Sequence, residues 1–120
     1  KKHLDIRSMK WVPAGLSGAV SARGSLAGVL FAVAMAALGY FMLHSPFYAV
    51  VILIAGIFGN LSDTLVGAYL QAKENTPDGG LKDRRKGKLV LGVRWITNDT
   101  TNLISSIIAC LVGFFGAHLF

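Results

Sequence analysis

Three long apolar stretches constrain this chain more than any other feature. They cover residues 24–43, 47–72 and 100–120, and the charged residues lie almost entirely outside them. The first stretch has 20 residues and no charge. A helix rises about 1.5 Å per residue, so this length matches the roughly 30 Å hydrocarbon core of a bilayer. We therefore predict an all-α, polytopic membrane protein with three transmembrane helices, built as a single membrane domain over residues 1–120.

The composition agrees with a membrane protein. Apolar residues make up 53% of the 120 residues, and the mean hydropathy is +0.57, which is too high for an ordinary soluble domain of this size. The formal net charge of +6 comes from cations that flank the apolar stretches. They favour anionic headgroups or a phosphorylated substrate over nucleic acid as partners. The one cysteine, Cys110, excludes an intrachain disulfide and a cysteine-rich metal site.

The cations also predict an orientation. Residues 1–23 carry five Lys and Arg and the 73–99 loop carries seven, whereas residues 44–46 and the C-terminus carry none. By the positive-inside rule the N-terminus and the basic loop are cytoplasmic, and the C-terminus faces the opposite side. Within the loop, residues 88–96 are predicted to form a short interfacial strand.

An acidic residue lies inside the second apolar stretch. A carboxylate in a membrane helix costs roughly 2.5–3.5 kcal/mol on insertion scales, so Asp63 is expected to face the bundle interior or a watery cleft. Gly56, Asn60, Gly67 and Gln71 share its helix face by their spacing of three or four residues. This face would bind a metal or a phosphate group. The alternative is that Asp63 only makes hydrogen bonds that aid helix packing.

A second polar group opens the third apolar stretch. Asn98, Asp99 and Asn102 lie within about one helical turn of one another, and hard oxygen ligands of this kind suit Mg²⁺. The alternative for Asp99 is an N-cap. Since both helix ends are expected at the cytoplasmic boundary, we predict that Asp63 and Asp99 act as the catalytic pair and share one Mg²⁺ ion.

Glycines and serines precede the first apolar stretch. Gly15, Ser17, Gly18 and Ser21 would cradle a phosphate at the helix N-terminus, or form a flexible lead-in loop. Lys10, Arg23 and Arg94 are the cations nearest in sequence to the polar motifs and are candidates for neutralising phosphate. The basic cluster at residues 82–88 is expected to face lipid headgroups, with contact to nucleotide phosphates as the less favoured interpretation.

Three motifs together resemble one integral membrane family. They are VPAGLSGAVS (12–21) followed by GSLAG (24–28), GNLSDTLVGAYLQ (59–71) and RWITNDTTN (94–102). The family includes the plant and cyanobacterial phytyl-phosphate kinases and a poorly characterised animal transmembrane protein. The match begins near Ser8 and corresponds to the C-terminal half of a longer family architecture. The family usually has Thr where this chain has Leu16.

The resemblance implies a function. It implies a kinase that uses a nucleoside triphosphate, CTP in the plant case, and phosphorylates an isoprenoid monophosphate such as phytyl phosphate. Mg²⁺ is the expected cofactor. Carried over by position, the resemblance implies the same candidate site residues: Asp63, Gln71, Asn98, Asp99 and Asn102. It also supports the phosphate loop, whose members are Gly15, Ser17, Gly18 and Ser21.

Two alternatives to this kinase stay open. A non-enzymatic small membrane transporter or a helix-packing subunit would also use glycine-rich helices and an intramembrane acid. A three-helix lipid kinase resembling bacterial diacylglycerol kinase fits the size, but that kinase uses glutamates within and beside its helices, and the one glutamate here, Glu74, lies in the long loop. In every case three helices make a thin bundle, which favours a homo-oligomer.

Overall fold

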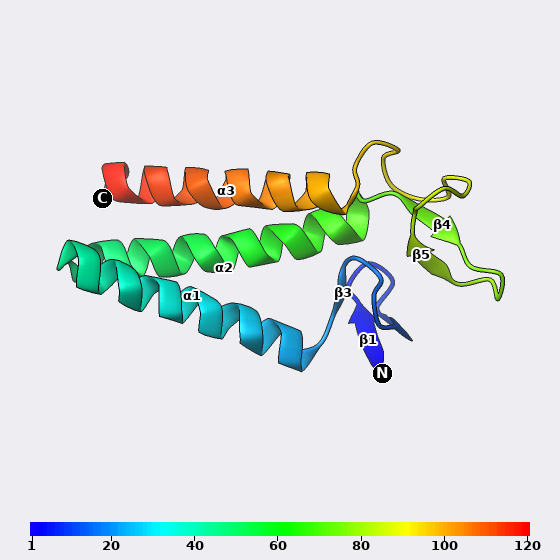
Figure 1. The fold of residues 1–120 in the computed structure, drawn as a ribbon, viewed down its shortest axis with the longest axis horizontal. Coiled ribbons are helices and arrows are strands. Elements are labelled where there is room, and N and C mark those ends of the chain that lie inside the picture. Colours follow the sequence, from blue (N-terminus) through cyan, green and yellow to red (C-terminus); the bar gives the residue numbers. More distant parts are fainter. The chain divides into compact units, whose positions relative to one another are not determined.

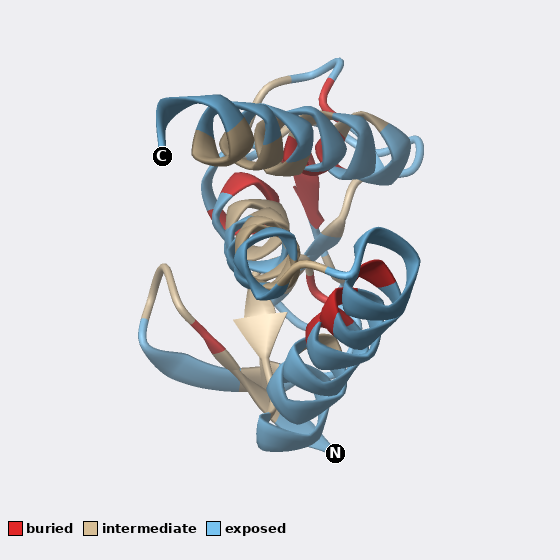
Figure 2. Cartoon of the chain, turned by 90° about the vertical axis from the view of Figure 1, so that its left-hand side faces the viewer, coloured by how far each residue is buried: buried red, intermediate tan, exposed pale blue.

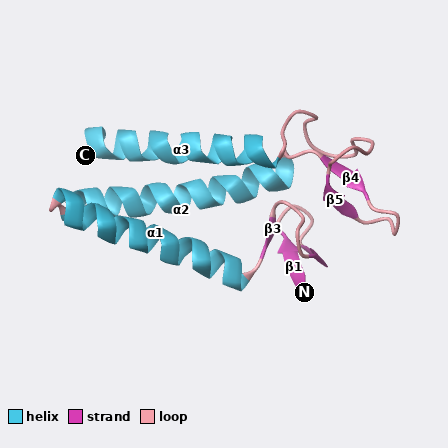
Figure 3. Ribbon diagram, in the orientation of Figure 1, coloured by secondary structure: helices cyan, strands magenta, loops and turns pink.

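The computed structural model describes residues 1–120 and contains three long helices and five short strands (Figures 1 and 3). In chain order they are β1 (Lys2–Asp5), β2 (Lys10–Pro13), β3 (Ala19–Val20), α1 (Ala22–Leu43), α2 (Pro46–Tyr69), β4 (Lys73–Asn75), β5 (Leu81–Asp83) and α3 (Asn98–Leu119). All three helices are long and apolar enough to cross a membrane. The prediction of three such helices is confirmed, but the all-α description is too narrow because the connecting segments form sheets. The orientation of the termini stays a prediction.

The chain divides into two compact units. A mixed unit contains residues 1–21 and 63–104, and a helical unit contains residues 22–62 and 105–120. Helices α2 and α3 contribute residues to both. Every residue of the polar cavity described below belongs to the mixed unit.

Small residues bring the helices of the helical unit together. Gly56 of α2 lies against Ala32 of α1, and Gly59 of α2 lies against Ala109 of α3. A Cβ at position 59 would be 2.9 Å from the Ala109 Cβ, so the close approach requires glycine. Contact through small residues is typical of helices that pack within lipid. Helix α2 is thus the central helix, with a neighbour on each side (Figure 1).

The large apolar side chains of the helical unit point outward. Phe31 and Phe41 are exposed, whereas the buried positions of α1 are the small residues Ala32, Ala36 and Gly39. Figure 2 shows the helices as mostly exposed, with burial confined to narrow patches. In water so large an apolar surface would drive association. This distribution is the one expected of helices that lipid surrounds.

Two antiparallel sheets build the mixed unit. In the first, β1 lies between β2 and β3; in the second, β4 pairs with β5 in the register Lys73–Asp83 to Asn75–Leu81. The β4–β5 turn closes through a bond from Thr76 N to Gly80 O of 2.9 Å, with Gly79 at φ +83°. This Pro-Asp-Gly-Gly turn explains why the strands form here. The predicted strand at residues 88–96 is wrong, because that segment makes only isolated bridges at Leu91 and Val93.

Helix α2 ends earlier than the apolar pattern suggested. Its last helical residue is Tyr69, and the backbone N–H groups of Leu70 and Gln71 both donate to Val66 O. The chain therefore leaves the helix just before Gln71. The expectation that Gln71 continues the helix face of Asp63 is wrong, since Gln71 lies in the turn that leads into β4.

Candidate functional site

A polar cavity of about 300 Å³ lies in the mixed unit. Two carboxylates, two guanidinium groups, two amides and one hydroxyl-bearing side chain line it. These residues are Gln71, Asp83, Arg84, Arg85, Thr97, Asn98 and Asp99. Gln71, Asn98 and Asp99 are candidate site residues from two separate sequence motifs, and the fold brings them to one cavity. Asp83, Arg84, Arg85 and Thr97 were not among the candidate site residues.

Gln71 connects the end of α2 to the start of α3. Its side chain is buried, and its Oε1 accepts a hydrogen bond of 3.1 Å from Thr101 Oγ1. The segment before α3 packs against its backbone, where a Cβ added to Gly92 would lie 2.2 Å from Gln71 O. Gly92 also has a φ of +83°, a conformation that favours glycine. These contacts attach Gln71 to the first turn of α3 and to the segment that precedes it.

Thr97, rather than Asp99, caps helix α3. The Thr97 Oγ1 accepts a bond of 3.4 Å from Thr100 N, as an N-cap side chain does for the third residue of a helix. Asp99 lies in the first turn, where a negative charge is favourable beside the helix dipole, and its side chain is exposed on the cavity wall. The N-cap interpretation of Asp99 is therefore wrong. Its carboxylate is accessible to a ligand.

The loop at Gly15–Gly18, which was predicted to bind phosphate, binds the Asp83 carboxylate of the same chain. Ser17 N donates to Asp83 Oδ1 at 3.0 Å, and Ser17 Oγ donates to Asp83 Oδ2 at 2.5 Å. The loop rests on α2, where Gly18 and Ala68 are in close contact. Ser17 can therefore bind a phosphate only by displacing Asp83. Leu16 is buried, so position 16, where the family usually has Thr, contributes a core side chain here.

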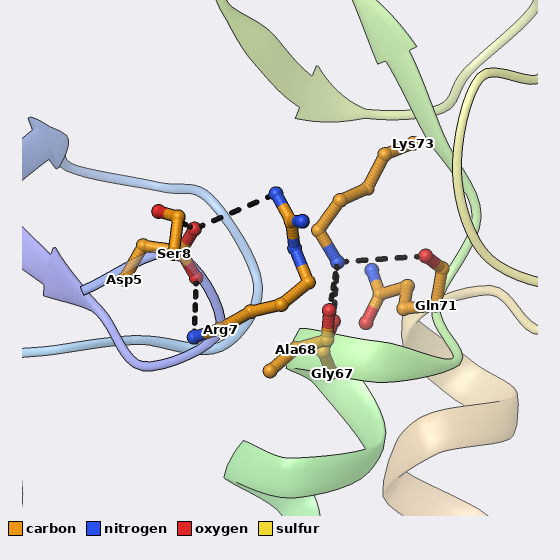
Figure 4. Close-up of polar contacts among 7 residues, drawn as sticks. All are labelled: Asp5, Arg7, Ser8, Gly67, Ala68, Gln71 and Lys73. Atoms are coloured by element: carbon orange, nitrogen blue, oxygen red, sulfur yellow. Dashed lines mark hydrogen bonds and ion pairs between the residues drawn. The ribbon is translucent and has the colours of Figure 1, made fainter. Parts of the chain in front are cut away.

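A buried lysine closes the end of helix α2 (Figure 4). Lys73 is 1% exposed, and its Nζ donates to the carbonyl oxygens of Gly67, Ala68 and Gln71. A cation at this position satisfies carbonyls that lack helical partners and complements the helix dipole. Burial lowers the pKa of Lys73, and the charges of Asp83 and Asp5 oppose that shift only in part. The sequence signal for this role was a lysine just beyond an apolar helix.

The β1–β2 turn is fixed by a buried acid. Asp5 accepts hydrogen bonds from Ser8 Oγ at 2.6 Å and from Arg7 N at 3.2 Å, and its Oδ2 lies 3.8 Å from Arg7 Nη2 (Figure 4). Burial alone would raise the pKa of Asp5, but these hydrogen bonds and the Arg7 charge outweigh it and lower the pKa. The lead-in segment is thus an ordered sheet.

Several predicted site residues do not line the cavity. Lys10 is exposed on β2 and Arg23 is exposed in the first turn of α1. Asn60 lies against Gly28 of α1, in the helical unit. The cavity lining does not include Asn102, which is exposed, or Asp63, which is half-buried. The functional roles of these residues stay predictions.

Exposed Gly15, half-buried Ser21 and the exposed Arg94 also lie outside the cavity lining. No group of three or more His, Cys, Asp or Glu side chains is arranged to hold a metal ion. Mg²⁺ does not need such a group, because it commonly binds through one or two carboxylates together with water and substrate phosphates. The Asp99 carboxylate and the Asn98 amide oxygen fit that mode. Asp63 stays the predicted second carboxylate.

Comparison with known proteins decides the family. Residues 1–110 match the family described as integral membrane protein DUF92. This chain belongs to that family. It is 33% identical to Protein VTE6, chloroplastic, of Arabidopsis thaliana over 110 residues, which are 88% of this chain and 28% of the relative. It is also 32% identical to the uncharacterized membrane protein MJ0933 of Methanocaldococcus jannaschii over 108 residues, 90% of this chain and 37% of the relative.

These matches confirm the resemblance drawn from the three motifs, and they identify an integral membrane protein. The chain spans 28% and 37% of the length of the two relatives. No solved structure matches it.

Proposed function

We propose that this chain carries the phosphoryl-transfer site of a membrane-embedded kinase for isoprenoid phosphates. The observation that carries the proposal is the polar cavity, where Gln71, Asn98 and Asp99 meet from two family motifs. Phosphoryl transfer asks a protein mainly for positioning and for stabilisation of charge. A cavity lined by carboxylates, amides and guanidinium groups meets that need. The resemblance to the phytyl-phosphate kinases supports a phytyl-like substrate and CTP as the donor.

The proposed reaction forms one bond and breaks one. An oxygen of the lipid monophosphate attacks the γ-phosphorus of the nucleoside triphosphate, the bond to the β-phosphate oxygen breaks, and a nucleoside diphosphate leaves. Mg²⁺, when bound, would neutralise charge on the phosphates. Asp99 and Asn98 would hold the metal and orient the phosphates, with Asp63 as the further predicted ligand. Gln71 would position the start of α3 through its bond to Thr101.

A lipid substrate requires its phosphate to lie near the membrane surface. Trp11 and Trp95 are 67% and 68% exposed, and both belong to the mixed unit. Exposed tryptophans are enriched at the headgroup level of bilayers. Since Trp95 directly precedes the Ile96–Thr97 entry into α3, these side chains support an interfacial position for the cavity. The isoprenoid chain would remain in the hydrocarbon region of the bilayer.

The test is a transfer assay on the full-length protein in lipid nanodiscs. With Mg²⁺, phytyl monophosphate and γ-labelled CTP, we expect label in the lipid diphosphate, and none after chelation of the metal. Asp99→Asn should lower the rate at least about tenfold. Asp78→Asn is the matched control, because Asp78 is an exposed acid of the same unit that does not line the cavity. Equal rates for the two variants would reject the role of Asp99.

The transporter and helix-packing alternatives predict a different result. Small-residue contacts such as Gly56 with Ala32 serve helix packing in either case, so they do not separate the alternatives. A transporter would move its substrate across the bilayer without consuming nucleotide. Absence of label transfer across a panel of isoprenoid monophosphates and nucleoside triphosphates would contradict the kinase proposal.

A further inference from the structure

We infer that Arg84 and Arg85 bind the phosphate groups of the ligand in the polar cavity. The inference rests on the proposed function and deepens it by assigning the phosphate-binding residues. Both arginines line the cavity, together with Asn98 and Asp99. Lys10 and Arg23, the cations nearest in sequence to the first motif, are exposed and lie outside the cavity lining.

The backbone fixes both arginines in place. Arg84 N donates to Ala72 O at 2.8 Å, and Arg85 N donates to Glu74 Oε2 at 3.3 Å. Ala72 and Glu74 are themselves buried. Arg84 therefore continues the β4–β5 pairing by one backbone bond, and the Glu74 side chain holds the backbone of Arg85 just beyond it. An arginine held in this way loses less conformational freedom on binding a ligand than one on a mobile loop.

The other cations of the 82–88 cluster do not share this position. Lys82 Nζ is 3.1 Å from Glu74 Oε1 and is occupied by that ion pair. Lys86 and Lys88 are exposed and do not line the cavity. The cluster thus separates into two cavity residues, one lysine paired with Glu74, and two exposed lysines that are free to face headgroups. Adjacent residues in one basic run have different roles.

The two guanidinium groups of the cavity suit an anion with several oxygens. The lining contains two guanidinium groups and two carboxylates, and Asp83 already accepts hydrogen bonds from the N–H and the O–H of Ser17. Asp99 is the carboxylate that remains for a metal. Guanidinium groups match phosphate oxygens with paired hydrogen bonds. Arg84 Nε donates to Gly87 O at 2.8 Å, which leaves the terminal nitrogens of Arg84 and the whole guanidinium of Arg85 for the ligand.

The same chemistry can come from the nucleotide or from the lipid monophosphate. The experiment therefore measures both. Full-length protein in neutral-lipid nanodiscs is titrated with CTP, with inorganic pyrophosphate and with phytyl monophosphate, each as a separate ligand. The variants are Arg85→Gln and Arg84→Gln, with Arg85→Lys to keep the positive charge and remove the paired N–H donors of the guanidinium. Lys86→Gln and Lys88→Gln are matched controls, since each removes one positive charge from the same run.

We expect Arg85→Gln to weaken binding about tenfold to a hundredfold, as is typical for loss of a charged hydrogen-bonding group. The lysine controls should change affinity less than about twofold, since Lys86 and Lys88 do not line the cavity and a surface charge away from the ligand contributes little. A loss for CTP and pyrophosphate assigns the arginines to the nucleotide, and a loss for phytyl monophosphate assigns them to the lipid. Intermediate affinity in Arg85→Lys supports recognition by the guanidinium fork.

Two results separate this inference from the proposed function. If label transfer occurs and both arginine variants bind all three ligands as tightly as the lysine controls do, the inference is overturned and the kinase proposal stands. If phosphate binding depends on the arginines but no transfer occurs, the phosphate site stands and the kinase proposal fails. Arg84→Gln also removes the bond to Gly87 and can loosen that turn. The ligand affinity of this variant is therefore interpreted only if the hydrogen-exchange rate of the Arg85 amide is unchanged.

Discussion

The contact between the Gly15–Gly18 loop and helix α2 predicts a large difference between two neighbouring glycine substitutions. Gly18 has a φ of +84°, and a Cβ there would lie 2.3 Å from Ala68 Cα and 2.6 Å from Ala68 N. Gly15 has a φ of +103°, but nothing lies within 4 Å of its added Cβ. Gly15→Ala therefore measures the backbone strain alone, and Gly18→Ala measures the strain together with a clash against backbone atoms.

The magnitudes follow from these two terms. A left-handed backbone conformation costs a residue with a Cβ about 1–2 kcal/mol. Overpacking in a closely packed site adds about 1–3 kcal/mol, and Ala68 belongs to a helix that cannot easily move away. We expect Gly15→Ala to destabilise the loop by about 1–2 kcal/mol and Gly18→Ala by about 2–5 kcal/mol.

Hydrogen–deuterium exchange in nanodiscs measures both effects. Ile6 N donates to Gly18 O at 3.3 Å and Ala19 N donates to Leu16 O at 3.0 Å, so these amides report opening of the loop. Because about 1.4 kcal/mol corresponds to a tenfold change, Gly15→Ala should speed their exchange about five- to thirtyfold. Gly18→Ala should speed it by a further factor of about five or more. Equal acceleration in the two variants would refute the close contact with Ala68.

Three further predictions concern charged groups. Ser17→Ala and Asp83→Asn should show a coupling of about 1.5–3 kcal/mol in a double-mutant cycle, because the Ser17 hydroxyl donates to a charged carboxylate. If the two substitutions have strictly additive effects on hydrogen exchange of the loop, that hydrogen bond is excluded. Asp5 and Glu74 have pKa values below their ordinary 3.8 and 4.5, so the unfolded chain binds more protons in that range and the mixed unit should lose stability as pH falls below about 4.5. Loop exchange, corrected for its intrinsic pH dependence, should accelerate there, and an unchanged corrected rate down to about pH 3 would contradict the assignment. Asp63→Asn should insert into the membrane normally and lose transfer activity at least about tenfold, whereas wild-type turnover would remove Asp63 as a metal ligand.

Some of the site could be read from the sequence because its signals are local. Asn98 and Asp99 are adjacent polar residues at the start of an apolar stretch, so their place at a helix N-terminus needs no long-range information. Gln71 was a candidate for the wrong structural reason, since the helix ends before it. The apolar stretch runs on to Ala72, and hydrophobicity does not distinguish a membrane helix from a buried turn that follows it.

The short strands were missed for a related reason. β3 has two residues and β4 and β5 have three each, which is too short for an alternating apolar pattern. β3 pairs with β1 in the register Leu4–Val20 and Asp5–Ala19, and this pairing holds it in place. The stability of β3 comes from this partner elsewhere in the chain, as with the bond between Ser17 and Asp83. No local pattern predicts such a pairing.

The sequence by itself determined two properties: the presence of three helices long and apolar enough to cross a membrane, and the family to which the chain belongs. Both depend on segment length, lack of charge and the order of motifs, which can be read from neighbouring residues. Only the tertiary structure decided which cations line the polar cavity. Lys82, Arg84 and Arg85 are equivalent in a basic run, yet Lys82 pairs with Glu74 while the two arginines line the cavity. The physical reason is that the backbone bond from Arg84 to Ala72 and the contacts to Glu74 orient these residues. Such bonds join segments that meet only when the chain folds.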